Sequence, residues 1–273
     1  MSLQWNFTGI EFQVLCDKYR GGALPDPLDY ILDEPMTLDE SGRLKEKTWE
    51  ELQSRWDPVW DSMIDVLCAP ELYIRVHGWD EVDQDNGAKN IYMHFARNGA
   101  QAFSFEQRPG KSFWHTDGFV VTERDPNGLA NAVVNSLPDV PPGRMPNTPM
   151  IIDPEEHVGN RGSSFFRDDD DDEPPAQISA RFWETRARLT GTVVIVQGRS
   201  MYGPRGIHEE KIMWRDVIGD GRYIMTMDDH PVAVGTSNTA FVRRIQKDID
   251  HLMDRVETQW EVGAESSYSE DRY

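Results

Sequence analysis

The chain carries the same succession of secondary-structure signals in each of its halves, and this repetition limits the folds available to it. A helical pattern comes first, two alternating apolar runs joined by a glycine-containing turn follow, and a second helical pattern closes the half. Short-repeat solenoids have periods of roughly 20–50 residues, and the period here is far longer. We predict one α+β fold made of two related halves, with the chance recurrence of common elements as the alternative.

Two β-hairpins are the clearest of these signals. In the first half, the alternating run 91–95 leads to Asn98-Gly99, a pair typical of the type I′ turn because both of its central residues take positive φ. In the second half, Gly219-Asp220-Gly221 separates the runs that carry Trp214 and Tyr223. Each half therefore contributes a hairpin to the predicted antiparallel sheet.

Helix starts are marked by capping residues. A Thr followed three residues later by Glu is the capping-box pattern, and it occurs at Thr8 and at Thr48. Asp57-Pro58 predicts a break in the second of these helices. Asp125-Pro126 and Ser237 are the expected N-caps of the helices that close the two halves.

Charge narrows the possible partners. The 273 residues include 48 acidic and 28 basic side chains, a formal net charge of −20, so the phosphate backbone of a nucleic acid is repelled. Arg243, Arg244 and Lys247 cluster on the last helix, but three neighbouring aspartates dilute them. We therefore expect no nucleic-acid site, and the negative charge favours solubility.

Targeting and redox signals are few. The N-terminus lacks a signal-peptide pattern, and no apolar run approaches the ~20 residues that span a bilayer, so we expect a cytoplasmic protein with no membrane insertion. Cys16 and Cys68 lie in apolar helical patterns and are expected to be buried free thiols. No zinc or calcium pattern is present, and we expect neither a metal nor a cofactor.

The expected organisation is one intimately joined globular unit with four parts. An N-terminal half covers 1–150, an acidic mobile linker 151–175, a C-terminal half 176–262 and a polar, frayed tail 263–273. The acidic run Asp168–Glu173 defines the linker, because consecutive carboxylates repel one another and do not pack.

Several stretches along the chain form a recognisable series: Phe7 to Leu15, Leu24-Pro25-Asp26-Pro27-Leu28, Ala96 to Ala102, 137–143 and Gly221 to Ile224. In this order they resemble the EspG family, the cytoplasmic chaperones of type VII (ESX) secretion in actinobacteria. The resemblance implies a pseudo-twofold α+β fold with a central antiparallel sheet flanked by two α-helical bundles. It also implies a chaperone that binds the helical tip of a PE–PPE heterodimer, keeps it soluble and delivers it to the secretion machinery without being an enzyme.

The resemblance implies a partner surface by region only: the loop after the second strand, one face of the sheet and the C-terminal bundle. The loop corresponds to about 78–89, where Trp79 is either an exposed anchor or folded back on the sheet. The candidate residues of the loop are Trp79, Asp80, Glu81, Asp83 and Asp85. Those of the second half, which alternation places on one face, are Arg222, Ile224 and Thr226.

Two other classes of function compete with the chaperone. His115-Thr116-Asp117 has the His-x-Asp spacing of an iron- and 2-oxoglutarate-dependent oxygenase, with His157 or His208 as a third ligand. A turn at Asp117-Gly118 explains the same residues without a metal. A structural subunit that associates through its last helix is the other alternative, because Trp260 extends the apolar stripe of that helix.

Overall fold

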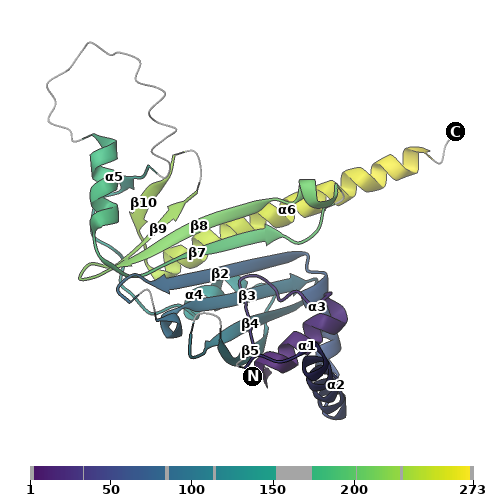
Figure 1. The fold of residues 1–273 in the computed structure, drawn as a ribbon. Helices are drawn as coiled ribbons and strands as arrows, with labels where there is room; N and C mark the ends of the chain where they lie inside the picture. Colours follow the sequence, from purple (N-terminus) through teal and green to yellow (C-terminus); the bar gives the residue numbers. More distant parts are fainter. Residues whose placement is uncertain are drawn as a thin grey trace, which may run out of the picture.

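The computed structural model describes residues 3–32, 34–83, 86–112, 115–151, 174–200, 202–227 and 230–270, with side chains up to residue 258. Within these residues, ten strands form one antiparallel sheet, and six α-helices pack around it (Figure 1). This is the α+β class that the sequence predicts.

The strands in chain order are β1 (Gln4–Phe7), β2 (Leu72–Asp80), β3 (Ile91–Asn98), β4 (Gln101–Pro109), β5 (Thr116–Arg124), β6 (Thr148–Pro149), β7 (Ala187–Gln197), β8 (Glu209–Val217), β9 (Arg222–Thr226) and β10 (Val232–Gly235). The helices are α1 (Gly9–Tyr19), α2 (Leu38–Ser54), α3 (Val59–Cys68), α4 (Leu129–Asn135), α5 (Pro175–Glu184) and α6 (Asn238–Glu270).

The two halves meet at the centre of the sheet. The strand order is β1-β5-β4-β3-β2-β7-β8-β9-β10-β6, and β2 pairs with β7 along its whole length, from Leu72 opposite Gln197 to Asp80 opposite Leu189. Outward from this pair, each side continues with a hairpin, β3–β4 in one half and β8–β9 in the other. The strand order is therefore alike on both sides, while the pseudo-twofold relation of the complete halves stays a prediction.

Helices cover the two faces of the sheet differently. On one face, α4 and α6 bury a core that crosses the β2–β7 junction and includes Ile74, Ile195 and Trp214. On the other face, α1–α3 cover β3–β5 around Phe105, and α5 covers the outer strands of the second half through Phe182. Figure 1 shows α1–α3 and α5 at opposite ends of the sheet. The strands β2 and β7 lie between them.

Helices α1 and α2 both begin with a capping box, but α2 begins upstream of the predicted position. Thr8 and Glu11 form the predicted capping box of α1. The box of α2 is Thr37 with Glu40, whereas Thr48 lies within the helix and its hydroxyl donates to the carbonyl of Leu44. The good helix formers Arg43 to Lys47, directly upstream of Thr48, continue the helix towards the earlier cap in spite of Gly42. The break at 57–58 is confirmed, since α2 ends at Ser54 and α3 begins at Val59.

Two predicted turns differ in detail from the structure. Asn98 pairs with Gln101, so the central residues of the first hairpin are Gly99 and Ala100, and of these only Gly99 has positive φ, at 58°. This is the pattern of a type II′ turn, which needs glycine only at its first central position. Gly118 lies inside β5 with φ of 112°, where a Cβ would lie 2.4 Å from the Phe7 carbonyl oxygen. The predicted turn at Asp117-Gly118 is therefore wrong.

Other expectations concern the ends of elements and the cysteines. The N-cap of α4 is Gly128 instead of Asp125, whose carboxylate accepts from the Asn127 amide. Ser237 accepts a hydrogen bond in the first turn of α6, as predicted. That helix runs to Glu270, so it includes most of the segment expected to be a frayed tail. Both cysteines are free, but Cys68 is exposed because it ends α3.

The acidic run Asp168–Glu173 lies outside the described residues, so the predicted mobile linker stays a prediction. Among the helices that the structure describes, none combines the length and the apolar character required to cross a bilayer.

Candidate functional site

Strand β2 separates a buried face from a half-exposed one. Its burial alternates along the whole strand, because successive side chains point to opposite faces of a sheet. Leu72, Ile74 and Val76 face the core beneath α4 and α6. The intervening side chains lie on the opposite face and are half-buried: Tyr73, Arg75, His77 and Trp79.

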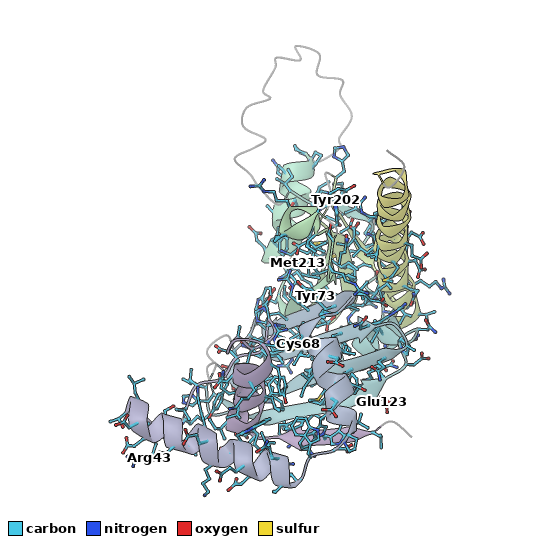
Figure 2. All side chains as sticks on the ribbon, turned by 90° about the vertical axis from the view of Figure 1, so that its right-hand side faces the viewer. Arg43, Cys68, Tyr73, Glu123, Tyr202 and Met213 are labelled. Carbon is cyan, nitrogen blue, oxygen red and sulfur yellow. The ribbon has the colours of Figure 1, made fainter. Side chains whose placement is uncertain are left out.

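Neighbouring strands widen this half-buried surface. Residues that pair directly across neighbouring strands point to the same face of the sheet. His77 pairs with Tyr92 on β3 and with Thr192 on β7. Thr192 pairs in turn with Met213 on β8. We name the half-buried set the central strip: Tyr73, Arg75, His77, Trp79, Tyr92, Thr192 and Met213. In the view of Figure 2, Tyr73 on β2 and Met213 on β8 appear between Cys68 at the end of α3 and Tyr202. The strip lies on this face between α1–α3 and α5, with Tyr73 and Tyr92 packed in part against the core under α1–α3 and Met213 in part against the core under α5.

Aromatic rings dominate the central strip. The ring of His77 stacks on Tyr92 at 4.9 Å between centroids and lies 5.5 Å from Trp79. Burial lowers the pKa of His77 below its usual value, so the imidazole is neutral at neutral pH. Arg75 bears the charge of the strip, and it is paired with Asp26 and Glu209, at 2.8 Å in each case. The strip therefore presents aromatic surface and, between Tyr73 and His77, one positive charge that is paired with carboxylates.

The β2–β3 loop continues from one end of the central strip. The Asp80 carboxylate accepts hydrogen bonds from the backbone amides of Val82 and Asp83, each at 2.8 Å. Asp83 in turn pairs with Lys89 at 2.8 Å. These contacts fold the loop back on itself and leave the Val82 side chain 46% exposed. The loop thus presents an exposed apolar side chain shortly after Trp79, the last strip residue of β2.

A buried ion pair holds the start of the loop in place. Arg215 on β8 donates two hydrogen bonds to Glu81, at 2.7 and 3.1 Å, and others to the carbonyl oxygens of Phe182 and Thr185 at the end of α5. Thr190 also donates to the Glu81 carboxylate. Burial alone raises the pKa of Glu81, but the hydrogen bonds from Arg215 and Thr190 outweigh it and lower the pKa. The loop and α5 are therefore tied to the same guanidinium.

The predicted residues of the loop have different places. Trp79 lies on β2, because the strand extends to Asp80 instead of ending near residue 77. Asp80 is buried and Glu81 faces Arg215, so both support the loop and offer little surface. Asp83 is half-buried in its ion pair. Asp85 lies outside the described residues.

Two of the three predicted residues of the second half lie in the interior. Ile224 faces the core opposite Tyr223, as the alternation predicts, but it is only 9% exposed. Arg222 is fully buried and pairs with Asp216 at 2.7 Å. Thr226 is half-buried at the end of β9. A side chain without exposed surface has nothing to offer a partner, so Arg222 and Ile224 are left out of the candidate surface.

Sequence reasoning overlooked the rest of the central strip and Val82. The signal was present in the alternation of Tyr73, Arg75, His77 and Trp79 with aliphatic residues, which is typical of a half-exposed strand. Val82 had no such signal, because its exposure results from the hydrogen bonds of Asp80.

The residues of the oxygenase alternative are dispersed. The His115 ring is hydrogen-bonded to Ser112 in the β4–β5 connection, and Asp117 is exposed on β5. His208 contacts Arg255 of α6, and His157 lies outside the described residues. Across the described part of the chain, no group of three His, Cys, Asp or Glu residues could hold a metal ion.

Comparisons with known proteins agree with this architecture. A solved structure titled as the Mycobacterium tuberculosis type VII secretion system chaperone EspG5, in complex with a PE25-PPE41 dimer, is similar with a TM-score of 0.53. The two chains are 11% identical, and the match covers 94% of this chain and 97% of that one, so the likeness concerns the fold. No curated protein matches the sequence. The model of the EspG family matches residues 8–247, and the chain therefore belongs to the EspG family.

Proposed function

We propose that this chain is a chaperone of type VII secretion that binds a PE–PPE heterodimer, contacts the helical tip of that dimer and delivers it to the secretion machinery. The binding surface consists of the central strip and the β2–β3 loop around Val82. Membership of the EspG family supports the class of function. The EspG5 structure, whose fold is similar, contains a PE25-PPE41 dimer, which supports the class of partner.

The observation that carries the proposal is the half-exposed aromatic surface at the centre of the sheet. Most of this face is covered by α1–α3 and by α5, but His77, Trp79 and Met213 between them keep part of their surface in contact with solvent. Aromatic and methionine side chains are enriched at protein interfaces. A surface of this kind fits the apolar side chains at the tip of a helical partner.

The mechanism requires binding alone. Apolar surface at a helical tip promotes self-association, and a chaperone that covers it lowers the concentration of free tips by mass action. The chain carries a net charge of −20, so a complex with it gains charge repulsion against aggregation. No bond is made or broken in this scheme, and we accordingly propose a non-enzymatic protein that works in the cytoplasm.

Co-expression tests the proposal. The chain is produced with each PE–PPE pair encoded in the same genome, and the products are separated by size-exclusion chromatography. We expect one pair or a few related pairs to elute with the chain in a stable complex, and to remain soluble at concentrations at which the pair alone precipitates. Failure of every pair to bind would contradict the proposal.

A further inference from the structure

A chain of aromatic rings runs from the exposed Tyr19 into the α1–α3 bundle, apart from the central strip, and ends at the buried Trp60. Tyr19 contacts Trp49 at 6.2 Å between centroids, Trp49 contacts Trp56 at 6.0 Å, and Trp56 contacts Trp60 at 5.3 Å. All three contacts are edge-to-face, with interplanar angles of 64°, 76° and 74°. Successive rings are therefore steeply inclined to one another, which turns aromatic faces in several directions.

Cations already lie over two of these rings. The Lys18 ammonium is 5.3 Å from the centre of the Trp49 ring, and the Arg55 guanidinium is 5.4 Å from that of Trp60. Both distances are within the range of cation–π attraction. Trp56 lies between these two tryptophans, and no cation from the described residues lies over its ring.

Trp56 instead borders a hollow of about 240 Å³. The hollow is lined by Tyr19, Trp49, Gln53, Trp56 and Asp61. The Asp61 carboxylate is exposed and accepts a hydrogen bond from the Trp56 indole at 3.3 Å. Three aromatic side chains and a carboxylate therefore surround the same space.

We propose that this hollow receives a lysine or arginine side chain from a partner protein. The flat faces of tryptophan attract a cation, and the Asp61 carboxylate supplies the opposite charge. An apolar side chain in the same place would remove water from Asp61 without replacing its hydrogen bonds, which is unfavourable. The strongly acidic chain also attracts basic segments over longer distances. The hollow is thus a second contact surface, which recognises a basic segment.

The contact is weak when taken alone. Cation–π and ion-pair contacts at exposed sites each contribute little, so we expect dissociation constants on the order of millimolar for one side chain. In a larger interface, the contact would add to the affinity of other contacts and select partners with a basic residue at the matching place.

A nuclear magnetic resonance titration of the full chain tests the proposal. The probes are N-acetyl-arginine methylamide and its neutral glutamine analogue, and the readout is the set of tryptophan indole N–H signals. The signals of Trp49 and Trp56 are assigned by their loss in Trp49→Phe and Trp56→Phe. We expect the arginine probe to shift both signals saturably and the glutamine probe to leave them unchanged.

Two variants that each remove one carboxylate distinguish binding in the hollow from a non-specific attraction of the arginine probe to an acidic protein. Asp61→Asn removes the charge that lines the hollow, whereas Asp65→Asn removes an exposed charge one turn further along α3, outside the lining residues. We expect the first to weaken binding of the arginine probe at least threefold and the second to leave it unchanged. The proposal is overturned if the indole signals do not move at tens of millimolar probe, if the two probes act alike, or if both variants have the same effect.

Discussion

Arg215 on β8 and Glu81 at the start of the β2–β3 loop form a two-point ion pair, with Nη2 2.7 Å from Oε2 and Nε 3.1 Å from Oε1. The same guanidinium lies 5.1 Å from the ring of Trp183 and donates to carbonyl oxygens at the end of α5. One buried cation thus connects two elements that border the central strip, and each of them comes from a different half of the chain.

Loss of this pair should cost stability. In Glu81→Gln the shape is kept, but the buried Arg215 loses its charged partner, and we expect the free energy of unfolding to fall by about 1–3 kcal/mol. Urea unfolding followed by circular dichroism measures the change. Glu123→Gln alters an exposed carboxylate of β5 and should change stability by less than about 0.5 kcal/mol. Equal effects of the two variants would show that the ion pair does not hold the structure.

Acid should destabilise the fold through His94. Burial lowers the pKa of this histidine to about 4, and its Nδ1–H donates to the carbonyl oxygen of Asp26 at 2.8 Å. In the unfolded chain, the imidazole of His94 takes up a proton near pH 6.5, whereas in the folded chain it stays neutral down to about pH 4. The free energy of unfolding is therefore unaffected by protonation of His94 above pH 6.5 and decreases as the pH falls from 6.5 towards 4. The loss attributable to His94 is about 3 kcal/mol. His94→Gln should be less stable at pH 7, and its stability should fall less between pH 6.5 and 4. An unchanged slope would refute the assignment.

Val82 should contribute to the affinity for a PE–PPE heterodimer. Val82→Asp places a charge on the exposed apolar tip of the loop, and we expect the affinity to fall tenfold or more, by about 1.4 kcal/mol. Leu38→Asp makes the same kind of change at a side chain on α2 that is 92% exposed, and it should bind like the original chain. Isothermal titration calorimetry compares the three proteins. A loss of affinity in Leu38→Asp alone would place the interface on the helical bundle.

Binding should also weaken in mild acid. A partner that covers the central strip buries His77 further, which favours the neutral imidazole and lowers a pKa that is already below its usual value. Protonation of His77 in the free chain then competes with binding. The affinity for the heterodimer is therefore highest at neutral pH and falls as the pH drops through the pKa of His77 in the free chain. His77→Gln should remove this part of the pH dependence. If the variant and the original chain show the same pH profile, His77 is not in the interface.

Several local signals predicted the fold correctly, although the turn at Asp117-Gly118 and the N-cap at Asp125 were wrong. The hairpin at Gly99, the capping box at Thr8 and the break at Asp57-Pro58 each result from the preferences of a few neighbouring residues, and the structure contains them. The start of α2 was misplaced because Thr37 and Thr48 carry the same pattern, and only helix propensity upstream of Thr48 separates them.

The candidate surface was harder to predict, because exposure depends on which helices cover which strands. The sequence indicates that Ile224 and Tyr223 face opposite sides of the sheet, but it does not indicate that α6 covers one side and α5 the other. Alternation placed Arg222 on one face with Ile224, yet its guanidinium is fully buried, with hydrogen bonds to Asp216, to Asn238 at the start of α6 and to the carbonyl oxygen of Pro138. Alternation along one strand cannot predict such long-range packing.

Hydroxyl-radical footprinting of the chain with and without a PE–PPE heterodimer tests whether the partner covers the central strip, since tryptophan, tyrosine, histidine and methionine side chains report their exposure in this experiment. We predict that the heterodimer reduces oxidation of Trp79, His77 and Met213, while Tyr19 on α1, which is 46% exposed, keeps its rate unless the partner also offers a basic side chain to the hollow beside it. If a bound heterodimer leaves the oxidation of Trp79, His77 and Met213 unchanged, the central strip is not the binding surface.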